Sequence, residues 1–422
     1  MLVSRVVSAL LLLLGLGLEG VRPARAQPTL APAPFAFNRA GRRQVRVPMQ
    51  LHRNLLIVEV TLNGAGPYNF LLDSGVGSSL ITDPAVAAAL RLRRGERYRI
   101  LGAGGANAGL QAFKTDSVRL GLGGVTAPAM SLLVLSEDVL NLSGYVGLPV
   151  HGILGSELFR SFVVTLHPEL FSFTLTDPAR YRAPHGKRWS TLPLSLENNK
   201  AYFTAQVQLS DTLTLPLKLV LDTGASHALS LELDSDPRLV APARRLPADL
   251  GQGLTGRVRG FLGRVATLHL GRYALRSVLT SFPDAADVHR RIDVPRNGNV
   301  GYELLKRFSL VIDYPHQRLL LRPNTSYPEP FEHDMCGVDL LAIGTDFRRF
   351  LIISVEPNSP AAIAGLLTDD ELLSINFLPV STMSLTQLSR IMHSDDSRVL
   401  LMVVRRANGD LHTATVRLKR QI

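Results

Sequence analysis

The segment Leu71-Leu72-Asp73-Ser74-Gly75 recurs 149 residues later as Val220-Leu221-Asp222-Thr223-Gly224. In both copies an apolar run with the composition of a β-strand leads directly into the aspartate, and turn residues precede that run. An internal repeat of this kind is typical of two copies of one structural unit in a single chain. The sequence therefore predicts two homologous halves.

A second pair of motifs follows the first at a similar distance. The segment Gly155-Ser156-Glu157-Leu158-Phe159-Arg160-Ser161-Phe162 parallels Gly301-Tyr302-Glu303-Leu304-Leu305-Lys306-Arg307-Phe308, and these glycines follow the aspartates by 82 and 79 residues. Two anchors in the same order and at similar spacing are hard to obtain by chance. Since strand patterns dominate both halves, we expect a mainly β fold with one lobe over residues 41–182 and a second over 183–328.

The two aspartates are candidate catalytic residues. A carboxylate at the end of a buried apolar strand is costly unless its charge is shared, and Asp73 and Asp222 can meet where two symmetric lobes join. Like charges at about 3 Å cannot both ionise, so such a pair shares one proton. The ionised member can deprotonate a water molecule, which attacks a peptide carbonyl that is hydrogen-bonded to the protonated member.

The residues that follow each aspartate fit the same scheme. The hydroxyls of Ser74 and Thr223 can tie the two loops together, and Gly75 and Gly224 allow a tight backbone turn beside the carboxylates. A single copy of this motif is more often an ordinary turn after a strand. The paired occurrence is what favours a catalytic site.

These loops resemble the paired active-site loops of pepsin-like and retropepsin-like aspartic peptidases. Two further segments, Ile153-Leu154-Gly155 and Asn299-Val300-Gly301, resemble the apolar-apolar-Gly segment that passes under each loop in that family. The most similar group is the bacterial retropepsin-like one with two fused lobes and a trailing PDZ domain. The resemblance implies a bilobal, pseudo-twofold β fold and an aspartic endopeptidase that cleaves polypeptide substrates without a metal or other cofactor. Because one chain holds both acids, we expect a monomer.

The loops also depart from the family pattern. Gly77 stands where a small or polar residue is more usual, and the glycine-rich flap candidates Leu101–Gly109 and Leu250–Gly260 contain no tyrosine. Val76 and Ala225 offer no hydroxyl to the carboxylates, so we expect a dyad that titrates higher than in strongly acidic peptidases, with activity from mildly acidic to neutral pH. The alternative is a catalytically inactive envelope protein that binds peptides; a carbohydrate-acting enzyme gains no support from the repeat.

Residues 329–422 differ in character from the two lobes. The runs Ser354–Ala361 and Asp370–Asn376 resemble a PDZ domain of bacterial envelope proteases. We expect a small α+β module with strands at 350–355 and 371–375, short helices near 361–364 and 384–392, and a hairpin formed by 399–405 and 412–418. The resemblance implies that a peptide C-terminus can add as a strand beside residues 350–355, with Asp346–Arg349 as the carboxylate-binding loop.

The N-terminus has the pattern of a secretory signal. A positive residue, an apolar run over Val6–Leu18 and Ala24-Arg25-Ala26 predict a signal peptide at 1–26, followed by an Ala/Pro-rich leader at 27–40. We therefore expect an exported protein, either periplasmic or secreted, with attachment to the envelope as an option. The formal charge of +11 is not accompanied by a nucleic-acid-binding motif, so no nucleic-acid partner is expected. Cys336 is the only cysteine, which excludes an internal disulfide.

Overall fold

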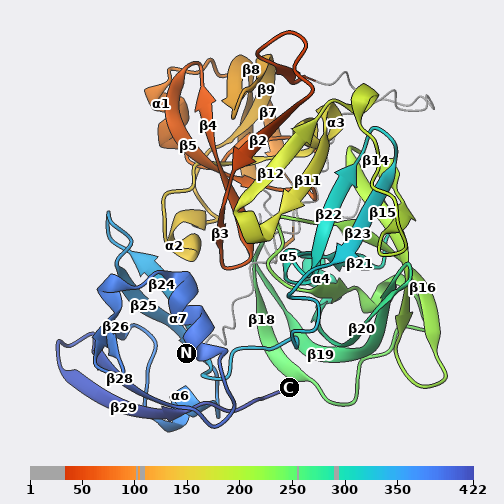
Figure 1. Cartoon of the computed structure of the whole chain (residues 1–422). Helices are drawn as coiled ribbons and strands as arrows, with labels where there is room; N and C mark the ends of the chain where they lie inside the picture. Colours follow the sequence, from red (N-terminus) through yellow and green to blue (C-terminus); the bar gives the residue numbers. More distant parts are fainter. Residues whose placement is uncertain (1–33, 101–102, 105–109, 254–255, 289–293) are drawn as a thin grey trace.

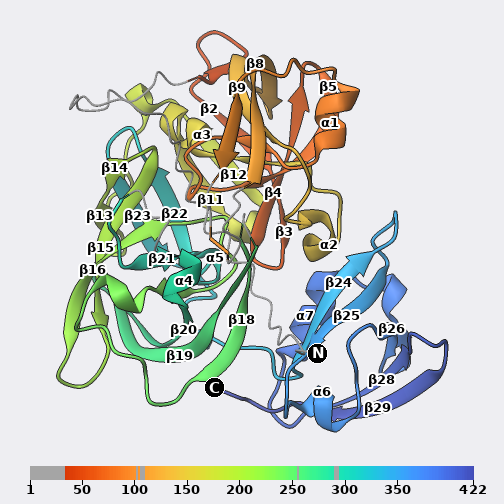
Figure 2. The ribbon, with the colours of Figure 1, turned by 180° about the vertical axis from the view of Figure 1, so that it is seen from behind.

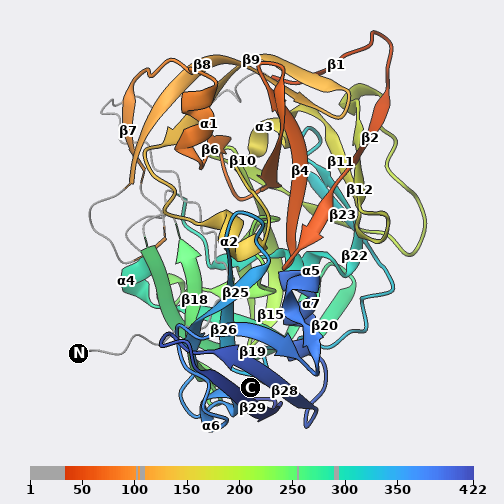
Figure 3. The ribbon, with the colours of Figure 1, turned by 90° about the vertical axis from the view of Figure 1, so that its left-hand side faces the viewer.

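The chain folds into two β-rich lobes and a smaller α+β domain at the C-terminal end. The computed structural model describes residues 34–100, 103–104, 110–253, 256–288 and 294–422. Lobe 1 runs from red to yellow in Figure 1, lobe 2 is green to cyan, and the C-terminal domain is blue. Figures 2 and 3 show the same three parts from behind and from the side. The expected fold class is thereby confirmed.

Lobe 1 contains a sheet with the strand order β1-β9-β6-β10-β5-β4-β8-β7, in which β3 also pairs with β4 and β8 with β9. Its strands are β1 (Ala36–Phe37), β3 (Gln50–His52), β4 (Leu55–Leu62), β5 (Ala65–Leu72), β6 (Leu80–Ile81), β7 (Arg97–Ile100), β8 (Leu110–Leu122), β9 (Val125–Leu135) and β10 (Gly152–Leu154). Its helices are α1 (Pro84–Ala89), α2 (Leu142–Val146) and α3 (Ser156–Ser161).

Lobe 2 repeats this plan with the order β14-β15-β16-β21-β17-β20-β19-β18. Its strands are β14 (Ser195–Glu197), β15 (Lys200–Gln208), β16 (Thr214–Leu221), β17 (Leu229–Leu231), β18 (Leu246–Gly253), β19 (Gly256–Leu270), β20 (Tyr273–Pro283) and β21 (Gly298–Val300). Its helical segments are η3 (Leu233–Ser235), α4 (Ala285–Val288) and α5 (Tyr302–Leu305). Each strand from β3 to β10 therefore has a counterpart from β14 to β21 with matching partners, as an internal repeat predicts.

A third sheet joins the two lobes, with the order β13-β23-β22-β11-β12-β2. Lobe 1 contributes β2 (Gln44–Pro48), β11 (Val163–His167) and β12 (Ser172–Thr176), and lobe 2 contributes β13 (Ser190–Pro193), β22 (Phe308–Asp313) and β23 (Arg318–Pro323). The short 3₁₀ segments η1 (Pro168–Leu170) and η2 (Pro178–Arg180) flank β12. The antiparallel contact of β11 with β22 pairs Thr165 with Val311 and continues one hydrophobic core through both lobes.

The C-terminal domain has the sheet order β24-β25-β26-β28-β29, with β27 paired to β26. Its elements are β24 (Val338–Ile343), β25 (Arg349–Val355), α6 (Pro360–Ile363), β26 (Glu371–Ile375), β27 (Leu378–Pro379), η5 (Val380–Thr382), α7 (Leu385–Met392), β28 (Val399–Arg405) and β29 (Leu411–Arg417). All expected elements are present within one or two residues, and Ser384 caps α7 in a capping box with Gln387. Strand β24, at the sheet edge, was not expected.

The predicted N-terminal segments lie mostly outside the described residues. This applies to the whole signal peptide at 1–26 and to the leader up to residue 33. The last leader residues differ from the expectation, because Ala36 and Phe37 pair with β9 and the Phe35 side chain is buried. Lobe 1 thus begins before residue 41. Within the described ranges, none of the helices has the length and apolar character that a bilayer crossing requires.

Candidate active site

Asp73 and Asp222 occupy corresponding positions at the ends of β5 and β16. Each is fixed by a backbone bond to the short strand beside it, since Asp73 N–H donates to Leu154 O (2.9 Å) and Asp222 N–H donates to Val300 O (3.0 Å). Those carbonyls belong to β10 and β21, which run parallel to β5 and β16. The strands are apolar and buried where they pair, so their register is fixed and each aspartate emerges at the junction of the lobes.

The residues after the aspartates tie the two loops to each other. The Ser74 N–H donates to Thr223 Oγ1 (3.0 Å) and the Thr223 N–H donates to Ser74 Oγ (3.0 Å). Each hydroxyl also donates across the interface, from Ser74 to Leu221 O (2.8 Å) and from Thr223 to Leu72 O (2.9 Å). These four buried bonds are related by the pseudo-twofold axis. They tie the loop after Asp73 to the loop after Asp222.

Gly75 and Gly224 are required by close approach and not by an unusual backbone conformation. Neither glycine has a positive φ. A Cβ atom at Gly224 would lie 2.2 Å from Asp73 Cγ, and one at Gly75 would lie 2.7 Å from Asp222 Cγ. Each carboxylate therefore lies directly over the glycine of the opposite loop, which brings the two carboxyl groups within hydrogen-bonding reach of each other. The expected turns are present at residues 74–75 and 223–224, and the close approach of the opposite carboxylate is a further reason for glycine there.

Burial dominates the electrostatics of the pair. The exposed fractions of Asp73 and Asp222 are 0% and 2%. Burial raises the pKa of Asp73 well above its ordinary value, and the neighbouring charge of Asp222 raises it further. Burial also raises the pKa of Asp222, but there a hydrogen bond from Asn299 opposes the shift. The pair therefore favours a state with one shared proton, and its titration is moved toward neutral pH.

Asn299 is a site residue that sequence reasoning missed. Its Nδ2 donates to Asp222 Oδ2 at 2.8 Å, and its Oδ1 lies 3.3 Å from His227 Nε2. The sequence contains a signal, because Asn299 stands in Asn299-Val300-Gly301 where the first copy has the apolar Ile153. In the structure Asn299 is fully buried. The resemblance of this segment to the apolar-apolar-Gly motif predicts no role for a polar side chain at its first position.

The other loop residues singled out in the sequence lie around the dyad. Gly77 packs against the turn of lobe 2, since a Cβ there would lie 3.0 Å from Asn198 O. Val76 and Ala225 are fully buried beneath their loops. Parts of both flap candidates lie outside the described residues. In the described parts Gly104 meets Gly256, where an added Cβ would lie 2.4 Å from the Gly256 nitrogen.

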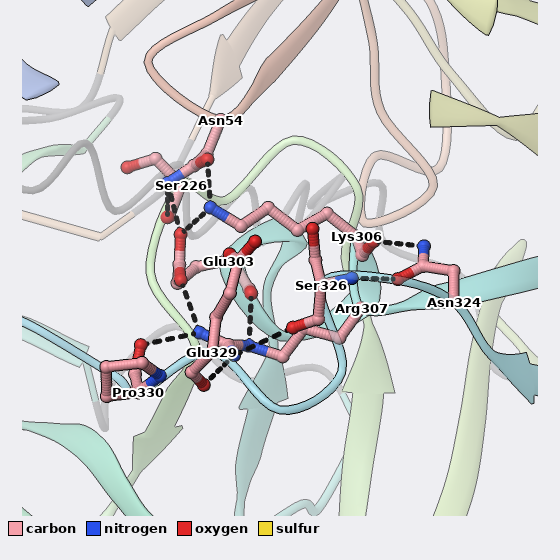
Figure 4. A network of polar contacts seen from close by, with 9 residues as sticks. All are labelled: Asn54, Ser226, Glu303, Lys306, Arg307, Asn324, Ser326, Glu329 and Pro330. Atoms are coloured by element: carbon pink, nitrogen blue, oxygen red, sulfur yellow. Dashed lines mark hydrogen bonds and ion pairs between the residues drawn. The ribbon is translucent and has the colours of Figure 1, made fainter. Parts of the chain in front are cut away.

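A hydrogen-bond network connects the turn of lobe 1 to lobe 2 near the second active-site loop. Asn54 Nδ2 donates to Glu303 Oε2 (2.7 Å) and to Ser226 O (3.3 Å), and Lys306 Nζ donates to Asn54 Oδ1 (3.1 Å). Figure 4 shows these side chains converging around Glu303. The network fixes the lobe 1 turn against the loop that follows Asp222.

The same network holds the linker to the C-terminal domain. The fully buried Arg307 side chain pairs with Glu303 Oε1 (2.8 Å) and stacks over the Phe331 ring at 3.8 Å. Its guanidinium also donates to the carbonyl oxygens of Ser326, Glu329 and Pro330, as Figure 4 shows. Five donors on one rigid group can satisfy several carbonyls at once. The linker is therefore part of the folded structure.

A cavity of about 860 Å³ lies where the lobes and the C-terminal domain meet. Each part contributes to its wall, including Asn54, Tyr145, Ser226, His227, Asp339 and His393. Neither Asp73 nor Asp222 lines it. The cavity reaches the loop after the second aspartate but not the carboxylates themselves.

The strand that was expected to receive a peptide is not a free sheet edge. Strand β25 pairs with β24 along its length and with β26 at its start, so residues 350–355 are not a free edge. In the expected carboxylate-binding loop, Arg349 is paired with Glu371 at 2.7 Å, and Arg348 donates to Met383 O at 3.3 Å. The edge strand on the β25 side of the sheet is β24, which contacts α7. The missed strand caused this error.

Lobe 1 packs against that edge. Arg53 Nη1 donates to Leu340 O on β24 (3.2 Å), and the Arg53 N–H donates to Thr386 Oγ1 on α7 (3.1 Å). Helix α2 also contacts β24. Lobe 1 therefore already occupies the Leu340 carbonyl on this sheet edge, where an added strand would need backbone partners.

Comparison with known proteins gives two family matches. Residues 58–158 match the family model described as aspartyl protease, and residues 351–406 match the one described as PDZ domain. No curated protein matches the chain significantly.

Two solved structures show more distant similarity. An aspartic proteinase from Irpex lacteus is 14% identical with a TM-score of 0.42, and the match covers 68% of this chain and 99% of that one. A photosystem II D1 C-terminal processing protease is 17% identical with a TM-score of 0.19, over 20% of this chain and 22% of that one. The match thus spans less than a quarter of the processing protease.

Proposed function

We propose that this chain, whose residues 58–158 match the aspartyl protease family model and whose residues 351–406 match the PDZ domain model, is an endopeptidase with Asp73 and Asp222 as its catalytic dyad. The observation that carries the proposal is the crossed packing of each carboxylate over the glycine of the opposite loop. This packing brings together two acids that share one proton, which is the arrangement that water activation requires.

The dyad can complete hydrolysis without a covalent intermediate. The ionised carboxylate takes a proton from water as the water oxygen bonds to the peptide carbon, and the protonated carboxyl gives its proton to the carbonyl oxygen. The first acid then protonates the amide nitrogen, the C–N bond breaks, and one hydroxyl of the diol returns a proton to the second acid. The products are a carboxylic acid and an amine, and the dyad regains its starting state.

The surrounding structure supports a working range from mildly acidic to neutral pH. The pKa values of both aspartates are raised, chiefly by burial. The single-proton form therefore persists to higher pH than for exposed aspartates. Since both carboxylates are almost fully buried, a polypeptide must displace the groups that cover them. We further propose that the protein acts outside the cytoplasm, on the basis of the signal pattern at 1–26, and that the PDZ domain binds peptides.

Cleavage of a mixed peptide pool between pH 4 and 8 tests this function. The parent protein is expected to cleave, and Asp73→Asn and Asp222→Asn are each expected to lower the rate by at least about 10³-fold, because neither step proceeds with one carboxylate. Asp236→Asn, at an exposed ion pair in lobe 2, is the matched control and should leave cleavage unchanged. Cleavage that survives either active-site change contradicts the proposal. Binding of peptides without cleavage favours the inactive, peptide-binding alternative.

A further inference from the structure

The two lobes place different side chains beneath equivalent aspartates. Ile153 pairs with Leu71 on β5, and Asn299 pairs with Val220 on β16, so both lie beside the residue two positions before an aspartate. Ile153 belongs to an apolar cluster with Leu71. In lobe 2 the same position presents an amide to Asp222. The two carboxylates therefore face different environments.

The amide of Asn299 has a defined orientation. An ionised carboxylate only accepts hydrogen bonds, so the NH₂ group faces Asp222 Oδ2 and the carbonyl oxygen faces His227. His227 is buried, and burial lowers the pKa of His227 to about 4, so its ring is neutral at working pH and donates through Nε2. If the amide were reversed, its NH₂ group would face His227 Nε2, and the ring hydrogen would have to lie on Nδ1. His227 Nδ1 is buried without a partner among the described residues, so a hydrogen there would be unsatisfied. His227 therefore locks the donor toward Asp222.

Asp73 has no comparable donor. Its Oδ1 accepts from the Gly75 N–H at 2.7 Å, matching the bond from Gly224 to Asp222 at 3.1 Å. Its Oδ2 is buried and, apart from the contact between the two carboxyl groups of the dyad, accepts no hydrogen bond from the described part of the chain. A buried carboxylate oxygen that accepts no such hydrogen bond is costly when it is charged. When Asp73 is protonated instead, its O–H can donate a hydrogen bond to the Asp222 carboxylate.

Other charged groups surround the pair. Lys200 on β15 and Arg296 before β21 favour the ionised form of Asp222, and Lys200 also acts on Asp73. The phenol of Tyr314 lies beneath the loops and donates to Ser74 O (3.1 Å); burial, followed by the two carboxylate charges, raises the pKa of Tyr314, so it stays neutral. Lys200 and Arg296 both belong to lobe 2.

We propose that Asn299 is a positioning residue that keeps Asp222 as the ionised member of the dyad and leaves the shared proton on Asp73. Asp222 is then the base that takes the proton from water, and Asp73 is the acid that protonates the carbonyl oxygen. The inference rests on the proposed function and assigns the two roles within it.

The test is the pH dependence of kcat/KM for three variants, since this quantity reports the acids of the free enzyme. Asn299→Ile gives lobe 2 the residue of lobe 1 and removes the hydrogen-bond donor to Asp222. The acid limb of the pH profile, where Asp222 ionises, is therefore expected to move to higher pH by about one unit. The alkaline limb, where Asp73 loses its proton, is expected to stay in place. Asn299→Asp has nearly the same size and donates only when protonated. Its activity should approach that of the parent at the acid end and fall far below it at pH 7. This variant keeps the test informative if Asn299→Ile does not fold.

Asn297→Ala is the matched control. Asn297 lies in the same segment and bonds to Ser235 Oγ (3.0 Å) and to the Lys218 N–H (2.8 Å), away from the dyad. Its loss is expected to lower thermal stability without moving either limb. An acid limb that stays in place in Asn299→Ile, or that moves equally in Asn297→Ala, overturns the role of Asn299.

A readout without substrate separates this inference from the proposed function. Aspartate labelled with ¹³C at Cγ gives one signal per carboxyl, and Asp73→Asn and Asp222→Asn identify the two that matter. Asp222 is expected to ionise at lower pH than Asp73 in the parent, with a smaller gap in Asn299→Ile. The reverse order, or an unchanged gap, contradicts the inference even if the protein cleaves peptides. Failure of cleavage with the expected order contradicts only the proposed function.

Discussion

Lobe 1 and lobe 2 share a strand plan but surround their aspartates with different chemistry. Backbone bonds to Leu154 and Val300 hold Asp73 and Asp222 in matching positions. The side chains behind them differ: Leu55 of lobe 1 corresponds to Lys200 of lobe 2, since each follows a two-residue turn at the start of its strand. Positions are thus fixed by the repeated backbone, whereas ionisation depends on side chains that the repeat does not preserve.

The largest expected effect comes from filling the space between the loops. Gly75→Ala and Gly224→Ala each place a Cβ atom within 2.2–2.7 Å of the opposite carboxyl carbon, a distance that non-bonded atoms do not tolerate. Both should lower kcat/KM by about 10²-fold or more, because small displacements of catalytic groups are costly. Kinetics of the purified variants checks this.

Gly77→Ala is the control on the same loop, since its Cβ atom meets Asn198 O at 3.0 Å and Asn199 Cβ at 3.7 Å and neither carboxylate. It should cost much less activity. If Gly224→Ala retains the parent rate, the crossed packing of carboxylate on glycine is wrong.

The cross-lobe hydroxyls test whether the two loops contribute equally. Ser74→Ala and Thr223→Val each leave a buried N–H and a buried carbonyl without a partner, so each should reduce the free energy of unfolding by about 1–3 kcal/mol. Denaturant titration measures the loss. Ser136→Ala, which removes an exposed hydroxyl bonded to Gln111 O, should change it by less than about 0.5 kcal/mol. Strongly unequal losses at positions 74 and 223 contradict the symmetric arrangement.

A smaller effect should appear in the pH dependence of stability. Both aspartates have folded pKa values raised above the ordinary 3.8, so the folded state binds their protons more tightly than the unfolded chain. Their contribution is therefore present below about pH 4 and is lost as pH rises through the folded values. Asp73→Asn is expected to raise Tm by a few degrees at pH 7 and not at pH 4.

Asp222→Asn should raise Tm less, because Asn299 already stabilises the Asp222 carboxylate. Calorimetry at both pH values makes the comparison. A drop of Tm at pH 7 in Asp73→Asn contradicts the cost assigned to burying that carboxylate.

The strand plan and the position of both aspartates follow from local sequence. Alternating and continuous apolar runs predict strands, and the recurrence of Asp-Ser/Thr-Gly at the same place in both halves predicts that the acids correspond. The hydrogen bonds between Ser74 and Thr223 were also predictable, because hydroxyl residues at the same position of both loops can bond to each other when the loops meet. The structure places these residues together, while their catalytic role stays a prediction.

Other features depend on packing that no local pattern shows. The need for Gly224 arises from a side chain 151 residues away in sequence at Asp73, and the role of Asn299 depends on which group lies beside it. Strand β24 (Val338–Ile343), by contrast, was not predicted although its largely apolar run before Gly344 is of the kind that indicates a strand. Residues 350–355 were consequently expected to be open to an added strand, whereas they pair with β24.

The most direct test of two carboxylates acting as one site is the rate of peptide cleavage by the double variant Asp73→Asn/Asp222→Asn beside the two single variants. Groups that act as a unit give strongly non-additive losses. We expect the double variant to be no slower than the slower single variant, with each single change already removing nearly all activity. Losses that multiply, or a single variant that still cleaves at a rate near that of the parent, contradict a shared dyad.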